Sequence, residues 1–250
     1  MKDFVFGTNE TGPNTVAVET SAASPDANPA TTLNDNIDGI RSGEELLEVP
    51  AAPAVDPAVL YASGVDQLAA ANAPAEFDAA VSKLQEAAAL GYPPAQLQMG
   101  ELYKTGQHVD ADLVRARTWF RRAANGGNVL AMHRVGVMNA RGDGGPSDAG
   151  EAINWFEQAG NRGLVDSMYN LGAIHHPNPS TDSATNSVQD AGKAYFWYSL
   201  AAINGDGQAQ TLAESVAIAL SASQRANLNA EISAWQPIPS EATANAVIAQ

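Results

Sequence analysis

Histidine and carboxylate side chains are the groups of this sequence that could bind a metal or transfer protons. The histidines are His108, His133, His175 and His176. No third metal ligand lies at a useful helical spacing from the adjacent pair, which precedes Pro177 at the expected end of a helix. A histidine in that place meets free backbone carbonyl groups favourably. We therefore favour a capping or loop role for His175 and His176 over a metal site.

Two pairs of acidic residues lie where helices are expected to begin, Asp110 with Asp112 and Asp148 with Glu151. A carboxylate at a helix start satisfies free backbone amides and the helix dipole, so these pairs do not indicate catalysis. The chain has no Gly-x-Ser-x-Gly, P-loop, His-Glu-x-x-His or dinucleotide-binding motif, and the glycines at 142–145 are weak evidence for phosphate binding. Because cysteine is absent, disulfides and thiolate metal sites are excluded. These features predict no catalytic residue, cofactor or metal.

Basic side chains are concentrated on one expected helix, which carries four of the 13 lysines and arginines of the chain. They are Arg115, Arg117, Arg121 and Arg122. Their spacing places them on two adjoining helix faces. In one interpretation they extend along the surface and pair with Asp110, Asp112 and Glu157. In the other they form a patch that binds an acidic partner or an anionic glycan strand.

A spacing of small and aromatic residues recurs along the chain. Its positions are Ala116, Trp119, Phe120, Ala123, Ala124, Gly127, Ala131, Val135 and Gly136. Most of these residue types return one step of roughly 36 residues upstream, where Lys83 and Leu84 take the two aromatic positions, and one step downstream. This period is typical of tetratricopeptide-class repeats. A fourth half-match begins at Ala194, after an insertion at 175–190. The chain is therefore predicted to be an array of repeats.

Each repeat is expected to be a helical hairpin. The apolar residues from Trp119 to Ala124 form one stripe on a helix, and Gly127 follows where a helix can close in the left-handed conformation. Gly136 lies inside the next helix, where glycine costs about 1 kcal/mol relative to alanine. The same glycine recurs at 64, 100 and 172. A repeated cost of this kind predicts helices packed too closely for a Cβ atom.

The fold class is therefore predicted to be all-α, an α-solenoid of antiparallel helical hairpins. Helices are expected at about 57–71, 76–90, 94–105, 111–124, 130–141, 148–161, 166–175, 190–203, 207–220 and 223–235. Residues 1–55 contain no apolar stripe and are expected to be a disordered acidic linker. The array is expected to cover 56–235 with a C-terminal capping helix, followed by an extended tail at 236–250.

The pattern Ala-x-x-Trp-Phe-x-x-Ala-Ala-x-x-Gly-x-x-x-Ala-x-x-x-Val-Gly resembles the Sel1-like repeat (SLR), a relative of the tetratricopeptide repeat, over roughly 56–235. The resemblance implies a TPR-like superhelix and a non-catalytic scaffold that binds proteins. The end of the chain, with Trp235-x-Pro237 and Ala244-Asn245-x-Val247, is similar to periplasmic, peptidoglycan-associated alphaproteobacterial SLR proteins of cell polarity. A peptidoglycan-binding module and a β-lactamase-like SLR hydrolase are the alternatives.

In helical-hairpin arrays the first helix of each hairpin lines the concave wall, and its free face meets the ligand. The positions that are expected to share this groove are Leu97, Glu101, Lys104, His133, Val137, Arg141, Tyr169, Ala173 and His176. A groove of apolar, aromatic and cationic side chains suits a protein or peptide segment better than a small metabolite. In the alternative interpretation, several of these side chains only contact the next repeat.

The net charge of −15 makes nucleic acid an improbable partner, because an acidic chain repels phosphate backbones. The sequence has no run of eighteen apolar residues, and its first residues lack a signal-peptide pattern. We expect a soluble chain that contacts a membrane only through an anchor outside this sequence. The resemblance implies a periplasmic location, and the cytoplasm is the alternative.

Overall fold

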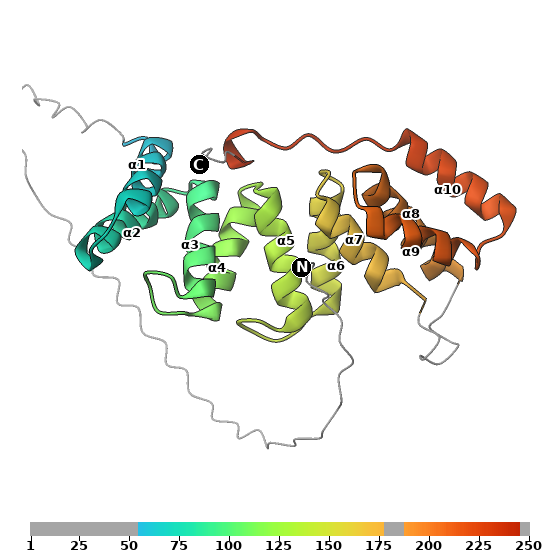
Figure 1. The fold of residues 1–250 in the computed structure, drawn as a ribbon, viewed down its shortest axis with the longest axis horizontal. Helices are drawn as coiled ribbons and strands as arrows, with labels where there is room; N and C mark the ends of the chain where they lie inside the picture. The colour runs from blue at the N-terminus through green and yellow to red at the C-terminus, as the bar shows by residue number, and fades with distance from the viewer. Residues whose placement is uncertain (1–54, 178–187, 246–250) are drawn as a thin grey trace, which may run out of the picture. The chain divides into compact units, whose positions relative to one another are not determined.

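The computed structural model describes residues 55–177 and 188–245. Ten α-helices and one short 3-10 helix make up these ranges, and they contain no strand. The helices are α1 (Pro57–Ala70), α2 (Pro74–Ala89), α3 (Pro93–Thr105), α4 (Leu113–Asn125), α5 (Val129–Arg141), α6 (Ala149–Gly160), α7 (Val165–His175), α8 (Val188–Ile203), α9 (Gly207–Ala217), α10 (Ala222–Ala234) and η1 (Thr243–Asn245) (Figure 1). The predicted all-α fold is confirmed. The predicted linker, apart from Val55, lies outside the described residues.

Consecutive helices pack on each other from α1 to α9. The hairpins α1–α2, α3–α4, α5–α6 and α7–α8 form the closest pairs, and each second helix also packs on the first helix of the next hairpin. Buried side chains therefore form a series of adjoining clusters along the chain. This arrangement is that of an α-solenoid, in which each repeat contacts its neighbours.

The recurring glycine in the first helix of each hairpin faces a large side chain of the second helix. A Cβ added to Gly100 would lie 2.5 Å from the ring of Phe120, and one added to Gly172 would lie 2.5 Å from the ring of Tyr198. In the first hairpin, a Cβ on Gly64 would lie 2.8 Å from a methyl carbon of Leu84. Real Cβ atoms do not come this close, so the prediction of close helix packing is confirmed.

The helix boundaries follow from local chemistry. Asp56, Asp112 and Asp148 precede helices and accept a hydrogen bond from a backbone amide of the first turn. Gly127 has a φ of 89°, so the chain leaves α4 through the left-handed conformation that its position in the repeat predicted. The acidic residues at 112 and 148 therefore serve as N-caps, as expected from their placement.

The last helix and the chain after it pack on earlier repeats. Helix α10 packs on α8, with Ile232 buried in the contact. After Trp235 the chain runs back along the array, and η1 packs on α3 (Figure 1). The described part of the predicted tail, residues 236–245, thus contacts the repeats, and its last five residues lie outside the described ranges.

Candidate interaction surface

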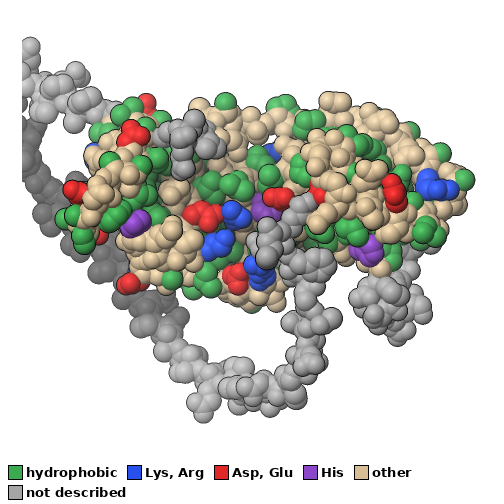
Figure 2. Space-filling view, in the orientation of Figure 1, with side chains coloured by type: hydrophobic (Ala, Val, Ile, Leu, Met, Phe, Trp, Pro, Cys, Tyr) green, Lys and Arg blue, Asp and Glu red, His purple; other side chains and the backbone are tan. Residues whose placement is uncertain are grey.

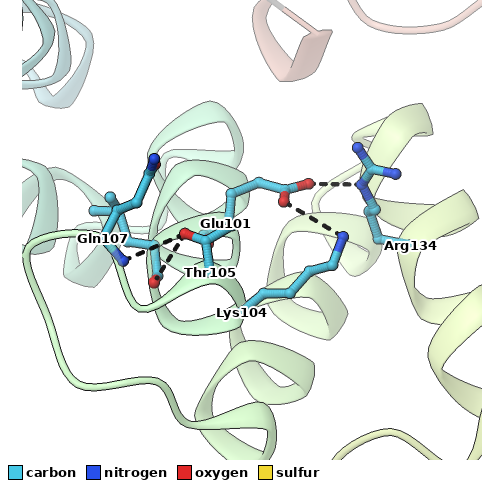
Figure 3. A network of polar contacts seen from close by, with 6 residues as sticks. Glu101, Lys104, Thr105, Gln107 and Arg134 are labelled. Atoms are coloured by element: carbon cyan, nitrogen blue, oxygen red, sulfur yellow. Dashed lines mark hydrogen bonds and ion pairs between the residues drawn. The ribbon is translucent and has the colours of Figure 1, made fainter.

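A network of charges joins the first helices of two neighbouring repeats. On α3, Glu101 accepts a hydrogen bond of 2.6 Å through Oε1 from Nε of Arg134 on α5 (Figure 3). The other oxygen, Oε2, lies 3.8 Å from Nζ of Lys104. The side chains of Glu101 and Arg134 are 27% and 28% exposed, so a partner can reach both. One carboxylate is therefore shared by two cations at an accessible junction between repeats.

Apolar side chains lie beside this network on the same helix faces. Leu97 is one turn before Glu101 on α3, and Leu130, which is 39% exposed, is one turn before Arg134 on α5. Arg141 is exposed two turns after Arg134. We call this surface the first-helix face and define it by Leu97, Glu101, Lys104, Leu130, Arg134 and Arg141. Figure 2 shows acidic, basic and hydrophobic side chains close together in the middle of the face that it draws.

Three of the predicted groove residues are buried in the packed array. His133, Val137 and Tyr169 are 5%, 7% and 9% exposed. His133 Nδ1 lies 2.9 Å from Oγ of Ser167 on α7, and the ring of Tyr169 lies 5.7 Å from that of Tyr198. His133 therefore contacts the next repeat, as in the alternative interpretation, whereas Tyr169 packs on the second helix of its own hairpin. Because all three side chains are buried, none of them lines a free face.

The other predicted groove residues remain accessible to different degrees. Leu97, Glu101, Ala173 and His176 are half-buried, whereas Lys104 and Arg141 are exposed. Arg134 was missed because it falls outside the repeat positions that defined the groove. The opposite charges of Glu101 and Arg134, which lie about one helical turn apart when neighbouring repeats are aligned, were the available signal.

The adjacent histidines lie where the sequence placed them, at the end of a helix. Helix α7 ends at His175, and His176 is its C-cap. The ring of His176 lies 5.8 Å from that of Tyr198, and burial lowers the pKa of His176. Burial, reinforced by Tyr169, raises the pKa of Tyr198. Within 55–177 and 188–245 no group of three or more histidines or carboxylates is arranged to hold a metal ion.

The four arginines of α4 are separated into different environments. Arg117 is 8% exposed and donates hydrogen bonds to Oδ1 of Asn139 and to the carbonyl of Pro146. Arg121 pairs with Glu151 on α6. Arg121 and the remaining two arginines are exposed, with Arg115 3.3 Å from Asp112 and Arg122 4.7 Å from the centre of the Trp119 ring. Because Arg117 is buried, it cannot belong to an exposed patch, and the predicted pair of Arg115 with Asp112 is present.

The glycine-rich loop after α5 is explained by packing. A Cβ on Gly145 would meet Nη1 of Arg117, and one on Gly144 would meet the carbonyl oxygen of Leu113. Gly144 also has a φ of 69°. The loop therefore lies against the start of α4 and its buried arginine, and its glycines make that contact possible. Their presence gives no support to phosphate binding.

No described helix has the length and apolar character needed to cross a membrane. This observation concerns residues 55–177 and 188–245 alone.

The comparisons with known proteins identify the repeat. The Sel1 repeat model matches residues 93–128, 129–164 and 182–206, and the first two matches coincide with the hairpins α3–α4 and α5–α6. A search of the curated proteins finds no match.

Two crystal structures share the fold. A Sel1 repeat protein from Oxalobacter formigenes matches with a TM-score of 0.54 and 26% identity over 71% of this chain and 51% of that one. The protein c5321, a protective antigen present in uropathogenic Escherichia coli strains, matches with a TM-score of 0.56 and 26% identity over 71% of this chain and 38% of its own. The match thus spans about half of the first relative and less of the second. The chain carries Sel1 repeats and has the SLR fold. Sel1 repeat proteins generally act as protein-interaction scaffolds.

Proposed function

We propose that this protein is a non-catalytic scaffold that binds an extended segment of a protein partner on its first-helix face. The observation that carries the proposal is the ion pair between Glu101 and Arg134, which places a shared charge network between two repeats at an accessible position. Surfaces built across repeats suit a ligand that runs along several of them. A polypeptide segment has this extended form, and a small metabolite does not.

The geometry of Arg134 favours an acidic residue in the partner. Within the described residues only Nε of Arg134 is engaged, by Glu101, and the two terminal nitrogens take no part in the contacts of Figure 3. A guanidinium group can hold a carboxylate through two parallel hydrogen bonds. Exposed Leu130, one turn away, would add an apolar contact beside that ion pair. The proposed ligand is therefore a peptide segment with a carboxylate next to an apolar side chain.

The test is capture of partners by the immobilised protein from a membrane or periplasmic extract, measured by quantitative mass spectrometry. Arg134→Ala is expected to reduce capture of specific partners by at least about tenfold, since arginine anchors often dominate interfaces. Arg225→Ala, on exposed α10, is the matched control and is expected to keep them. Unchanged capture by a folded Arg134→Ala variant would contradict the proposal.

Peptidoglycan is the competing ligand, and sedimentation with purified sacculi separates it from a protein partner. The buried position of Arg117 makes that residue unsuitable for a charge reversal, so Arg115→Glu with Arg122→Glu is the appropriate variant. We expect the protein to stay in solution with sacculi. Sedimentation that is abolished by this double variant, but not by Arg134→Ala, would favour the glycan.

We further propose that the chain is a periplasmic segment of a PodJ-like protein, a polar localisation or envelope-organising factor, held to the membrane by an anchor outside this sequence. The support is the resemblance of its C-terminal pattern, Trp235-x-Pro237 followed by Ala244-Asn245. Because the chain contains no cysteine, Ser233→Cys provides a single thiol on an exposed position. A maleimide that cannot cross the cytoplasmic membrane is expected to label it in cells with a permeabilised outer membrane. Labelling only after lysis would place the protein in the cytoplasm.

A further inference from the structure

The C-terminal segment occupies the turn between α4 and α5. Oδ1 of Asn245 accepts a hydrogen bond of 2.8 Å from the amide of Val129, the first residue of α5, and Nδ2 of Asn245 donates one of 3.3 Å to the carbonyl of Gly127. Nδ2 of Asn128 donates a hydrogen bond of 2.7 Å to the carbonyl of Ala244. Two residues near the end of the described chain therefore satisfy three polar groups of a turn more than a hundred positions earlier.

The turn is built to receive these groups. Asn128 is only 3% exposed, and its Oδ1 is fixed by the amide of Ala131 at 2.8 Å, which directs Nδ2 toward Ala244. The amide of Val129 belongs to the first turn of a helix, where no acceptor within the helix is available. Asn245 supplies that acceptor from outside. The site therefore has a buried donor, an open amide and an open carbonyl in fixed positions.

The site selects its occupant by size and by hydrogen-bonding pattern. Ala244 is 2% exposed and lies against Gly127, because a Cβ added to Gly127 would lie 3.5 Å from the Cβ of Ala244. The burial of Ala244 therefore favours a small side chain at this position. At the next position an asparagine provides one acceptor for Val129 and one donor for Gly127. Aspartate would set a charged oxygen against the carbonyl of Gly127, and alanine would lose both bonds. A small residue followed by asparagine is the pair that fits.

The occupant is held by few contacts. Residues 236–243 are all exposed. Besides its contacts with the turn and the packing of η1 on α3, the segment is held to the repeats by one hydrogen bond of 2.8 Å from the amide of Ile238 to the carbonyl of Asn161. A hydrogen bond within the segment also stabilises its conformation, because Nδ2 of Asn245 donates to the carbonyl of Glu241 at 2.9 Å. A net hydrogen bond changes an equilibrium constant by roughly two- to tenfold. A handful of such bonds gives a contact that can exchange.

We propose that the α4–α5 turn is a peptide-binding site for a small residue followed by asparagine, and that residues 236–245 of the same chain are its built-in, displaceable ligand. This site is distinct from the first-helix face and does not depend on the function proposed for that face. A peptide that carries the same pair competes with the tail for the turn.

Amide hydrogen exchange in the full chain tests the contact. Asn245→Ala is expected to increase the exchange rate of the Val129 amide by about tenfold or more, because two hydrogen bonds to the turn are lost. The amide of Ala131, which is held by Asn128, is expected to change by less than about twofold. Ser240→Ala, in the exposed part of the tail, is the matched control. An unchanged rate at Val129 in Asn245→Ala would overturn the assignment of this contact.

Peptide binding tests the selectivity and the displacement. The probe is a dye-labelled, amidated peptide with the sequence of residues 236–245. This peptide is expected to bind the full-length Asn245→Ala variant at least about tenfold more tightly than it binds the wild-type chain. The reason is that the tail of the variant lacks the two hydrogen bonds of Asn245 to the turn and so competes less with the peptide. Adding Asn128→Ala to this variant, or replacing the asparagine of the peptide with alanine, is expected to abolish the gain. An equal affinity of the peptide for both proteins, or an affinity that does not change when the peptide asparagine is replaced with alanine, would overturn the proposal.

Discussion

In the third hairpin the ring of Phe156 packs directly on the backbone of Gly136: a Cβ added to Gly136 would lie 2.7 Å from Cδ1 and Cε1 of that ring. Both residues are buried, and Phe156 is fully enclosed. The same relationship occurs between Gly100 and Phe120. The glycine therefore allows an aromatic ring to rest on the backbone of the first helix, and this contact defines the hairpin.

The first prediction concerns this contact. Gly136→Ala is expected to lower the free energy of unfolding by about 1–3 kcal/mol, because overpacking outweighs the better helix propensity of alanine. Gly192→Ala, inside α8, is the matched control, since its Cβ would lie 3.8 Å from Leu228. The control is expected to raise the free energy of unfolding by about 0.5–1 kcal/mol. Urea unfolding measures both, and an unchanged midpoint for Gly136→Ala would contradict the packing argument.

The second prediction concerns the buried arginine. Arg117→Ala is expected to destabilise the protein by about 1–3 kcal/mol, because Oδ1 of Asn139 and the carbonyl of Pro146 lose their donor. Arg117→Lys is not expected to restore the loss, since a single ammonium cannot reproduce the guanidinium geometry. Arg122→Ala, an exposed neighbour on the same helix, is expected to cost about 0.5 kcal/mol or less. Thermal melts that rank Arg122→Ala as the more harmful change would contradict this role.

The third prediction concerns the ion pair between Glu101 and Arg134. A double-mutant cycle with Glu101→Gln and Arg134→Gln is expected to give a coupling free energy of about 0.5–1 kcal/mol, because both side chains are partly exposed. Raising the salt concentration to about 1 M is expected to reduce the coupling by screening. A coupling of zero at low salt would mean that this contact does not join the two repeats in solution.

The fourth prediction concerns pH. Burial lowers the pKa of His176 below its ordinary value of 6.5, so the unfolded chain binds a proton at this residue more readily than the folded chain. The contribution of His176 to stability is therefore lost as the pH falls through about 6.5. The drop in melting temperature between pH 7.5 and pH 5.5 is expected to be smaller in His176→Gln than in the wild-type chain. An equal or larger drop in the variant would contradict the shift.

The helical array could be predicted from the sequence because its physical causes are local and repeated. The apolar spacing around Phe120 marks a helix, Gly127 marks its end, and Gly136 marks the close contact in the next helix. The largest difference between an expected and an observed helix boundary is three residues, at the end of α9, which the sequence placed at 220 and the structure places at Ala217.

The side-chain surroundings were harder to predict because they depend on the rotation of one repeat against the next. His133 and Tyr169 occupy positions equivalent to half-buried Leu97, yet both are buried, His133 beside Ser167 of the next repeat and Tyr169 beside Tyr198 of its own hairpin. The contact of Asn245 with Gly127 and Val129 joins residues more than a hundred positions apart, and no periodic pattern marks it. Sequence periodicity therefore identifies the repeats but not the contacts that the tail makes with them.

The most direct test of the scaffold function is site-specific photo-crosslinking in living cells. A benzophenone amino acid at Lys104 or Leu130 places the reactive group on the first-helix face, and the same group at Thr118 or Gln158 places it on exposed positions of the second helices. Adducts with a partner protein are expected from Lys104 and Leu130, several times more abundant than those from Thr118 and Gln158. Adducts that form equally from all four positions, or only from the second helices, would contradict the scaffold function.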